Sequence, residues 1–213
     1  MANVLANTGV MVNPPALESF ANGGQVYNAD LFGGFNVSAE KVNPLFTFRK
    51  GDGSVVNSEI LTNLEEAGKI GSTMAFLVTH VGFRVVCLDP EHGPLTPAEA
   101  AAVKSLLAMA TVELSYGSNK TKVGEFTGLH CVAPVDFVTE TAEGTTTATA
   151  VAANAGNCGG NFIKLSENIQ IEPNLNISGV VRFAGVPTVL YTSTNENKFG
   201  FVVDLYGVKI VAA

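Results

Sequence analysis

Apolar side chains recur at every second position along much of this chain, which is the pattern of half-buried β-strands. The clearest example places Ile177, Val181 and Phe183 on one face and Ser178 and Arg182 on the other. We therefore predict that strands are the main elements. Further strands are predicted at residues 72–88, 128–137, 161–165, 187–192 and 199–213, with hairpins over residues 44–57 and 111–126.

The last of these runs, residues 199–213, is apolar on both faces. Such a strand fits the centre of a sheet, where both faces are covered. We expect the opposite sheet to cover one face and a helix or a neighbouring subunit to cover the other. Asp204 and Lys209 are expected to mark solvent-facing or paired ends of the strand. Residues 72–88 are long for one strand, so we expect Gly82 to mark a bulge or a bend.

One helix is predicted, over about residues 97–110. Thr96 supplies an N-cap hydroxyl, Pro97 suits the first helical position, and Glu99 can reach back to the cap amide. Apolar residues such as Leu106 then recur at helical spacing, which predicts one buried stripe. Together these elements indicate an all-β fold, an antiparallel jelly-roll β-sandwich with one short inserted α-helix.

Two segments lack the periodicity of a packed element. Residues 1–40 are rich in Asn, Gly and Ala, and we expect an extended N-terminal arm that orders against something else. Residues 41–213 are then expected to form a single jelly-roll domain. The Thr-rich and Ala-rich residues 141–160 carry no charge after Glu143, so we expect a contact surface there rather than a solvated loop.

Composition and charge restrict the possible partners. Hydrophobic residues make up 46% and charged residues 15% of the chain, which favours a packed core beneath a nearly neutral surface. The net charge is −7, and residues 1–40 contain no Lys or Arg, so the clustered positive charge that binds phosphates is missing. We therefore expect no direct binding of nucleic acid. We also expect no secretion signal and no membrane-spanning segment.

The best candidate for a metal or acid–base site is the stretch that carries Asp89, Glu91 and His92. Carboxylate and imidazole groups are metal ligands, and here they lie close together in the sequence. Pro90 and Gly93 in the same stretch are turn residues, and turns collect Asp and His because these side chains bond to nearby backbone groups. We favour a solvated turn before the helix over a metal site.

The three cysteines, Cys87, Cys131 and Cys158, are widely spaced and are expected to be free thiols. His130 precedes Cys131, but neighbouring residues on a strand point in opposite directions, so the two side chains cannot act as base and nucleophile there. Cys158 lies among glycines, and no partner base can be named for it. We therefore predict no catalytic, cofactor-binding or metal-binding residues, no cofactor, and no enzyme activity.

Several motifs follow one another in the second half of the chain. The capped helix runs into Val-Glu-Leu-Ser-Tyr-Gly, and then come Ile-Gln-Ile-Glu-Pro-Asn at residues 169–174, the alternating strand, and Val-Asp-Leu-Tyr-Gly-Val at residues 203–208. This order resembles that of capsid proteins of tailless icosahedral bacteriophages with an internal membrane. The resemblance covers residues 97–137 and 166–211, about half of the chain.

The resemblance implies one or two upright jelly rolls per chain and trimeric or pseudo-hexameric capsomers over a lipid vesicle. It carries over no catalytic residues. Because two complete rolls would leave little length for each strand in 213 residues, a single roll is preferred. The expected function is that of a structural subunit of an icosahedral virion shell, made in the host cytoplasm. Its expected partners are copies of itself, other capsid proteins and an internal membrane.

Two other classes of function stay open. A jelly-roll module that binds carbohydrate or a receptor would need aromatic side chains exposed on one face or at loop tips. The chain has four Tyr and no Trp, which is a thin supply for stacking on sugars. An enzyme would need a metal or acid–base group, for which Asp89, Glu91 and His92 are the candidates.

Overall fold

The structure is a computed structural model, and it describes residues 3–4, 11–12, 25–117, 120–130, 137–140, 149–152, 162–173, 176–192 and 195–211. The described strands are β1 (Asn3–Val4), β2 (Met11–Val12), β3 (Gln25–Asn36), β4 (Val42–Leu45), β5 (Met74–Cys87), β6 (Ala110–Tyr116), β7 (Thr121–Thr127), β8 (Phe137–Glu140), β9 (Thr149–Ala152), β10 (Ile163–Ile171), β11 (Ile177–Phe183) and β12 (Phe199–Val211). The described helices are α2 (Ser58–Leu61) and α3 (Pro97–Ala108), with the 3₁₀ turns η1 (Gly128–His130) and η2 (Thr188–Leu190).

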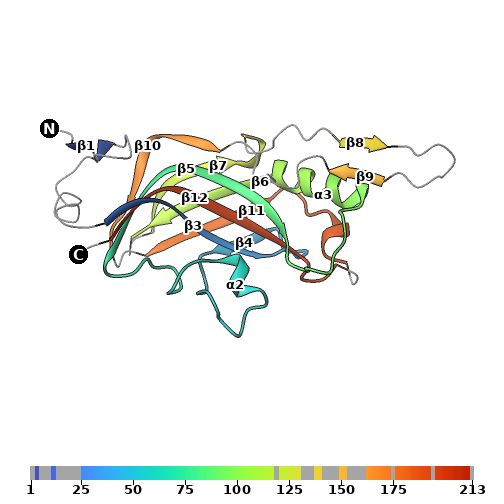
Figure 1. The fold of residues 1–213 in the computed structure, drawn as a ribbon, viewed down its shortest axis with the longest axis horizontal. Coiled ribbons are helices and arrows are strands. Elements are labelled where there is room, and N and C mark those ends of the chain that lie inside the picture. The colour runs from blue at the N-terminus through green and yellow to red at the C-terminus, as the bar shows by residue number, and fades with distance from the viewer. Residues whose placement is uncertain are drawn as a thin grey trace.

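Two antiparallel four-stranded sheets form the body of the protein (Figure 1). One sheet has the order β10-β5-β12-β3 and the other the order β4-β11-β6-β7. Apolar side chains from both sheets meet in one core, for example Phe201 and Val203 of the first with Val112 and Val181 of the second. The fold is therefore an all-β sandwich, which confirms the predicted class at this level.

Strand β12 lies inside the first sheet and pairs with β5 on one side and with β3 on the other. Phe201, Val203 and Leu205 point into the core, and each is at most 1% exposed. The C-terminal run is thus a central strand, as its two apolar faces predict. Asp204 does not mark an end of this strand, because it is buried in the middle and pairs with Arg84.

The segment that contains α2 covers part of the outer face of β12. Leu61 of α2 and Phe48 before it form a buried cluster with Leu88 and Val202. The predicted helix is present as α3, but it lies at one end of the sandwich, where Leu106 joins the main core (Figure 1). The helix over β12 is therefore α2, which the sequence did not predict because a single turn has no stable pattern of its own.

The predicted hairpin over residues 44–57 is wrong. Strand β4 ends at Leu45, and the chain turns at Phe46, whose φ of 60° lies in the left-handed region. Phe46 joins the main core, whereas Phe48 joins the cluster beneath α2. Because these two side chains are buried on opposite faces of the first sheet, the chain leaves the strand to place both of them.

The irregularity in β5 lies at Thr79 and not at Gly82. The register with β12 shifts between Tyr206 and Gly207, whereas pairing continues through Gly82. Gly82 has a different role, because the ring of Phe162 occupies the space that a Cβ atom would need. The extra residue at Thr79 reverses which residues of β5 face the core.

Two other predicted strands take a different form. Residues 187–192 contain η2, in which Leu190 is fully buried, and Pro187 has no N–H group to give to a ladder. In residues 128–137, the first three form η1 and the last begins β8, while residues 131–136 lie outside the described part. The predicted strands at 72–88, 161–165 and 199–213, the alternating strand β11 and the hairpin at 111–126 are confirmed.

The boundary of the predicted N-terminal arm also differs. Gln25–Asn36, which the sequence analysis assigned to the arm of residues 1–40, form β3 and pair with β12 along its length. Within the Thr-rich and Ala-rich segment, Thr149–Ala152 form β9, which pairs with β8. The domain therefore includes β3 as one of the four strands of its first sheet.

Deleting residues 206–213 is expected to abolish cooperative folding. The deletion removes Val208 and Ile210, which are at most 1% exposed. It also takes the partner strand away from the first half of β3 and one of two partner strands from β5. Losing each buried side chain costs about 2–5 kcal/mol, against a total stability of about 5–15 kcal/mol. Thermal unfolding followed by circular dichroism measures this. Deletion of residues 212–213 is the control, and an unchanged transition in the longer deletion contradicts the prediction.

Candidate functional site

The loop that carries His92 packs against the first turn of α3. The predicted capping box is present: the Glu99 amide donates to the Thr96 hydroxyl (3.3 Å), and the Thr96 amide donates to Glu99 Oε2 (2.8 Å). The hydroxyl of Thr96 also donates to Glu99 Oε2 (2.8 Å). Glu99 thus acts first as a structural group that holds the start of the helix.

The other carboxylate oxygen of Glu99 binds a distant loop. Asn195 donates through Nδ2 to Glu99 Oε1 (2.9 Å) and to the carbonyl of Val189 (2.8 Å). His92 Nε2 lies 3.4 Å from the same Glu99 oxygen without hydrogen-bond geometry, and its ring packs edge-on against Phe199. This polar cluster therefore joins the cap of α3 to the segment between η2 and β12.

The three candidate metal ligands do not converge. Asp89 Oδ1 accepts from the amide of Glu91, and Asp89 Oδ2 pairs with Lys198 Nζ at 3.3 Å. The side chain of Glu91 is exposed, whereas His92 turns toward Glu99. Among the described residues, no group of three or more His, Cys, Asp or Glu side chains is placed to hold a metal ion.

Hydrogen bonds lower the pKa of the Glu99 carboxyl. Burial acts to raise the pKa of this carboxyl, but the bonds from Thr96 and Asn195 and the nearby His92 outweigh it and hold the pKa below its ordinary value of 4.5. Asp89 also has a lowered pKa, chiefly because it accepts the Glu91 amide. Both carboxylates are therefore ionised at neutral pH, and neither is suited to act as a general acid.

A second charged group lies on the outer face of the first sheet. Asp204 Oδ2 accepts from Arg84 Nε at 2.8 Å, and the guanidinium lies 5.2 Å from the centre of the Phe32 ring. Asp204 is 2% exposed, and its Oδ1 has no hydrogen-bond partner among the described residues. Burial raises the pKa of Asp204 by more than Arg84 lowers it. Burial likewise raises the pKa of Tyr206 next to it.

The thiol candidates show no catalytic arrangement in the described part of the chain. Cys87 is a free, exposed thiol whose Sγ lies 3.4 Å from the carbonyl oxygen of Asp89. Cys131, Cys158 and the side chain of His130 lie outside the described residues, so the predictions made for them stay predictions.

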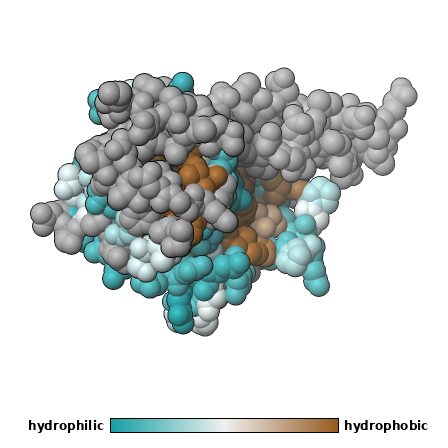
Figure 2. Space-filling view, turned by 60° about the vertical axis from the view of Figure 1, so that its left-hand side comes forward, coloured by the Kyte–Doolittle hydropathy of each residue, from teal (hydrophilic) through white to brown (hydrophobic). Residues whose placement is uncertain are grey.

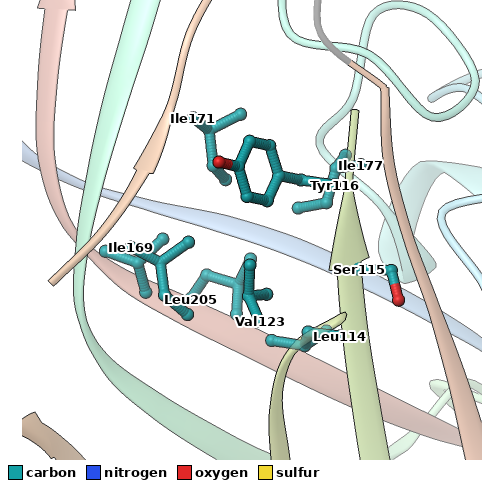
Figure 3. Close-up of a pocket in the computed structure, with 9 residues that line it drawn as sticks. Leu114, Ser115, Tyr116, Val123, Ile169, Ile171, Ile177 and Leu205 are labelled. Carbon is teal, nitrogen blue, oxygen red and sulfur yellow. The ribbon is translucent and has the colours of Figure 1, made fainter. Parts of the chain in front are cut away.

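An apolar pocket lies between the two sheets, at the side of edge strands β7 and β10. Its cavity volume is about 10 Å³. Figure 3 shows the side chains around this space. They come from both sheets and include Tyr116, Val123, Ile169, Ile171 and Leu205. None of the described residues that line it is charged, and its volume is far below the roughly 300–1,000 Å³ of most ligand sites. We interpret it as a gap in core packing.

The described surface also exposes large apolar side chains. These are Val42, Val56, Ile60, Leu129 and Phe162. Val56 and Ile60 lie four residues apart in and just before α2, and they are 56% and 46% exposed. The sequence analysis did not single them out, because their exposure depends on how α2 packs.

No family model matches this chain, and no curated protein matches it either. The described helices are all too short or too polar to cross a membrane. The geometry therefore has to carry any functional conclusion.

The ionisation of Asp204 is expected to lower stability. The folded state raises the pKa of this carboxyl above its ordinary value of 3.8. The stability that the Asp204 carboxyl contributes is therefore greatest below pH 3.8, and it is lost as the pH rises through the raised pKa of the folded state. The free energy of unfolding of the wild type, minus that of Asp204→Asn, should therefore fall between acidic and neutral pH. Urea titrations across this range measure it, with exposed Glu65→Gln as the control. A constant or rising difference contradicts the prediction.

Glu99 is expected to show the opposite trend. Its lowered pKa means that the ionised form stabilises the fold above pH 4.5, and this contribution is lost as the pH falls through the lowered value. Glu99→Gln should cost about 1–2 kcal/mol at neutral pH, because hydrogen bonds to a charged group are replaced by bonds to a neutral one. The same urea titrations should show the cost shrinking in acid. A cost that does not change with pH would mean that the carboxylate charge is unimportant.

Proposed function

We propose that the sandwich is a jelly roll. Of the eight strands in the two sheets, the first (β3) pairs with the last (β12), and the second (β4) pairs with the seventh (β11). The third (β5) pairs with the sixth (β10), and the fourth (β6) pairs with the fifth (β7). Nested pairing of this kind results when one long hairpin is folded over into two sheets. It supports a jelly roll, with β8 and β9 inserted between the fifth and sixth strands.

On this fold we propose a structural subunit of an icosahedral virion shell, which assembles through contacts with copies of itself. The nested strand pairing is the observation that carries the proposal, because viral capsid proteins are a major class of jelly roll, beside lectins and cupins. The low share of charged residues, 15%, agrees with it, since charged groups are depleted in the cores of interfaces. The exposed apolar pair Val56 and Ile60 offers one place for such a contact.

The two other jelly-roll classes have less support. A cupin-type site needs converging His and Glu ligands, whereas His92 here turns toward the helix cap. A sugar-binding module needs exposed aromatic rings. Of the aromatic side chains whose exposure the structure describes, Phe162 is the exposed one, and its ring packs on Tyr206 at 4.4 Å. We therefore rank carbohydrate or receptor binding second.

The proposal includes the remaining expectations for a shell subunit. The partners are other copies in capsomers, other capsid proteins and an internal membrane, without direct contact to nucleic acid. The protein is made in the host cytoplasm and located in the virion. No cofactor and no enzyme activity are part of this function.

The purified protein is expected to form trimers, hexamers or closed particles. Light scattering on a sizing column gives the mass, and negative-stain microscopy of the same peak shows the particles. The double variant Val56→Lys, Ile60→Lys should raise the concentration needed for assembly about tenfold, which corresponds to about 1.4 kcal/mol of lost contact energy.

Glu59→Lys is the matched control for that double variant. It changes the net charge by the same amount in the same short segment, but it replaces no apolar side chain. Equal effects of the two variants would assign the loss to charge instead of to the apolar contact. A clean monomer at high concentration in the wild type would favour the binding module.

A further inference from the structure

One edge of the first sheet is long and unbroken. Strand β3 lies at the end of the order β10-β5-β12-β3, and it pairs with β12 over its whole length without a register shift. The backbone groups on its other side point away from the sheet. Such a row of N–H and C=O groups is a template for pairing with another chain, and proteins commonly block it.

The other edges of the two four-stranded sheets are short or interrupted. The pairing of β10 with β5 breaks between Lys164 and Ile169, and that of β7 with β6 shifts between Leu114 and Ser115. Strand β4 has four residues, and its Pro44 has no N–H group to give. Bulges, short strands and proline all hinder the addition of a strand. Strand β3 has none of these features, so its edge needs protection of another kind.

Thr62 and Asn63, which follow α2, bind the edge of β3. The Phe32 amide donates to Asn63 Oδ1 (2.9 Å), and Asn63 Nδ2 donates to the carbonyl of Asp30 (2.9 Å). The carbonyl of Phe32 accepts from the Thr62 hydroxyl (3.1 Å) and from the Asn63 amide (3.4 Å). The carboxamide of Asn63 thus offers the edge one acceptor and one donor, as a peptide group of a neighbouring strand would. We call Thr62 and Asn63 the edge cap.

Buried neighbours hold the edge cap in place. Leu61 and Leu64, on either side of it, are at most 1% exposed; Leu61 packs with Val202, and Leu64 joins the main core. Thr62 is also 1% exposed, and it forms an isolated bridge with Gly33 of β3. Figure 2 shows mostly hydrophilic residues at the bottom of the molecule, where Figure 1 places the segment around α2. This segment therefore closes the edge from within and presents polar residues to solvent.

The edge cap shortens the open part of the edge. Alternate residues of a strand direct their backbone groups to the same side, so those of Val26 and Asn28 point the same way as those of Asp30 and Phe32. Within the described part of the chain, no hydrogen bond reaches the outward groups of Val26 or Asn28, and Asn28 is exposed. Without Asn63 the open stretch would cover residues 26–32, which is the length of an ordinary strand. With it, the stretch is limited to residues 26–28.

We propose that the edge cap keeps β3 from pairing with β3 of a second copy, and that loss of the Asn63 carboxamide opens this edge. A second copy has the matching chemistry, because two such edges can pair antiparallel about a two-fold axis with donors opposite acceptors. This inference does not rest on the proposed function. A contact through Val56 and Ile60 would use the outer side of the α2 segment, whereas the edge cap acts on its inner side.

The variant Asn63→Ala tests this proposal. We expect it to self-associate at a concentration at least about tenfold below that of the wild type, because the opened edge gains backbone hydrogen bonds with a second copy. Light scattering on a sizing column measures this. Adding Asn28→Pro should reverse the gain, since proline removes an outward N–H group and leaves the pairing with β12 intact. Adding Asn28→Ala, which keeps that N–H group, should not reverse it.

Asn57→Ala is the matched control. Asn57 lies in the same segment and donates to Asn36 Oδ1 (3.4 Å) and to the carbonyl of Asn197 (3.2 Å), but the bonds described for it reach no backbone group of β3. Equal association of this control and Asn63→Ala would assign the effect to a loosened segment and overturn the proposal. An unchanged association of Asn63→Ala, or one that Asn28→Pro does not reverse, would overturn it too.

Hydrogen exchange in the wild type keeps the proposal testable if Asn63→Ala does not fold. After correction for intrinsic rates, the amide of Phe32 should exchange at least about tenfold more slowly than that of Asn28, because the Asn63 carboxamide holds it. Similar rates for these two outward groups of the same edge would overturn the proposal without any variant.

Discussion

The rest of the structure depends on the burial of β12 on both of its faces. This strand lies between β3 and β5 in one sheet, and its inward residues, such as Phe201 and Val203, form the centre of the core. A strand in this position needs cover on its outer face as well. The structure supplies this in part with the α2 segment, which packs on Val202. Val208 and Ile210, which are buried on the outer face together with Ala75 and Leu77, show that the same requirement continues to the other end of the strand.

One extra residue in β5 makes the two-sided burial possible. Without the bulge at Thr79, Val78 would face outward and Leu77 would face the core. With it, β5 places apolar side chains in the core on both sides of the bulge, and it also places Leu77 on the outer face, opposite Val208. A long apolar strand therefore carries buried side chains on both of its faces.

The pKa values of two buried carboxylates are shifted in opposite directions by their surroundings. Glu99 accepts several hydrogen bonds at the start of α3, and these outweigh its burial. Asp204 accepts a hydrogen bond from Arg84, and its other oxygen has no partner among the described residues, so burial has the larger effect on its pKa. Neither carboxylate lies beside a nucleophile or a group of metal ligands in the described part of the chain, and both are placed to join segments that are distant in sequence. The contacts described for both carboxylates are structural ones.

The sequence by itself determined the elements whose signals are local. The capping residues Thr96 and Glu99 specify the start of α3, and the alternation around Val181 specifies β11, because neighbouring residues carry all the information. Only the tertiary structure decided the turn at Phe46, the packing of α2 and the Arg84–Asp204 pair, whose members lie 120 positions apart. The physical reason is that burial and pairing between distant segments outweigh weak local preferences, and such contacts leave no periodic trace in the sequence.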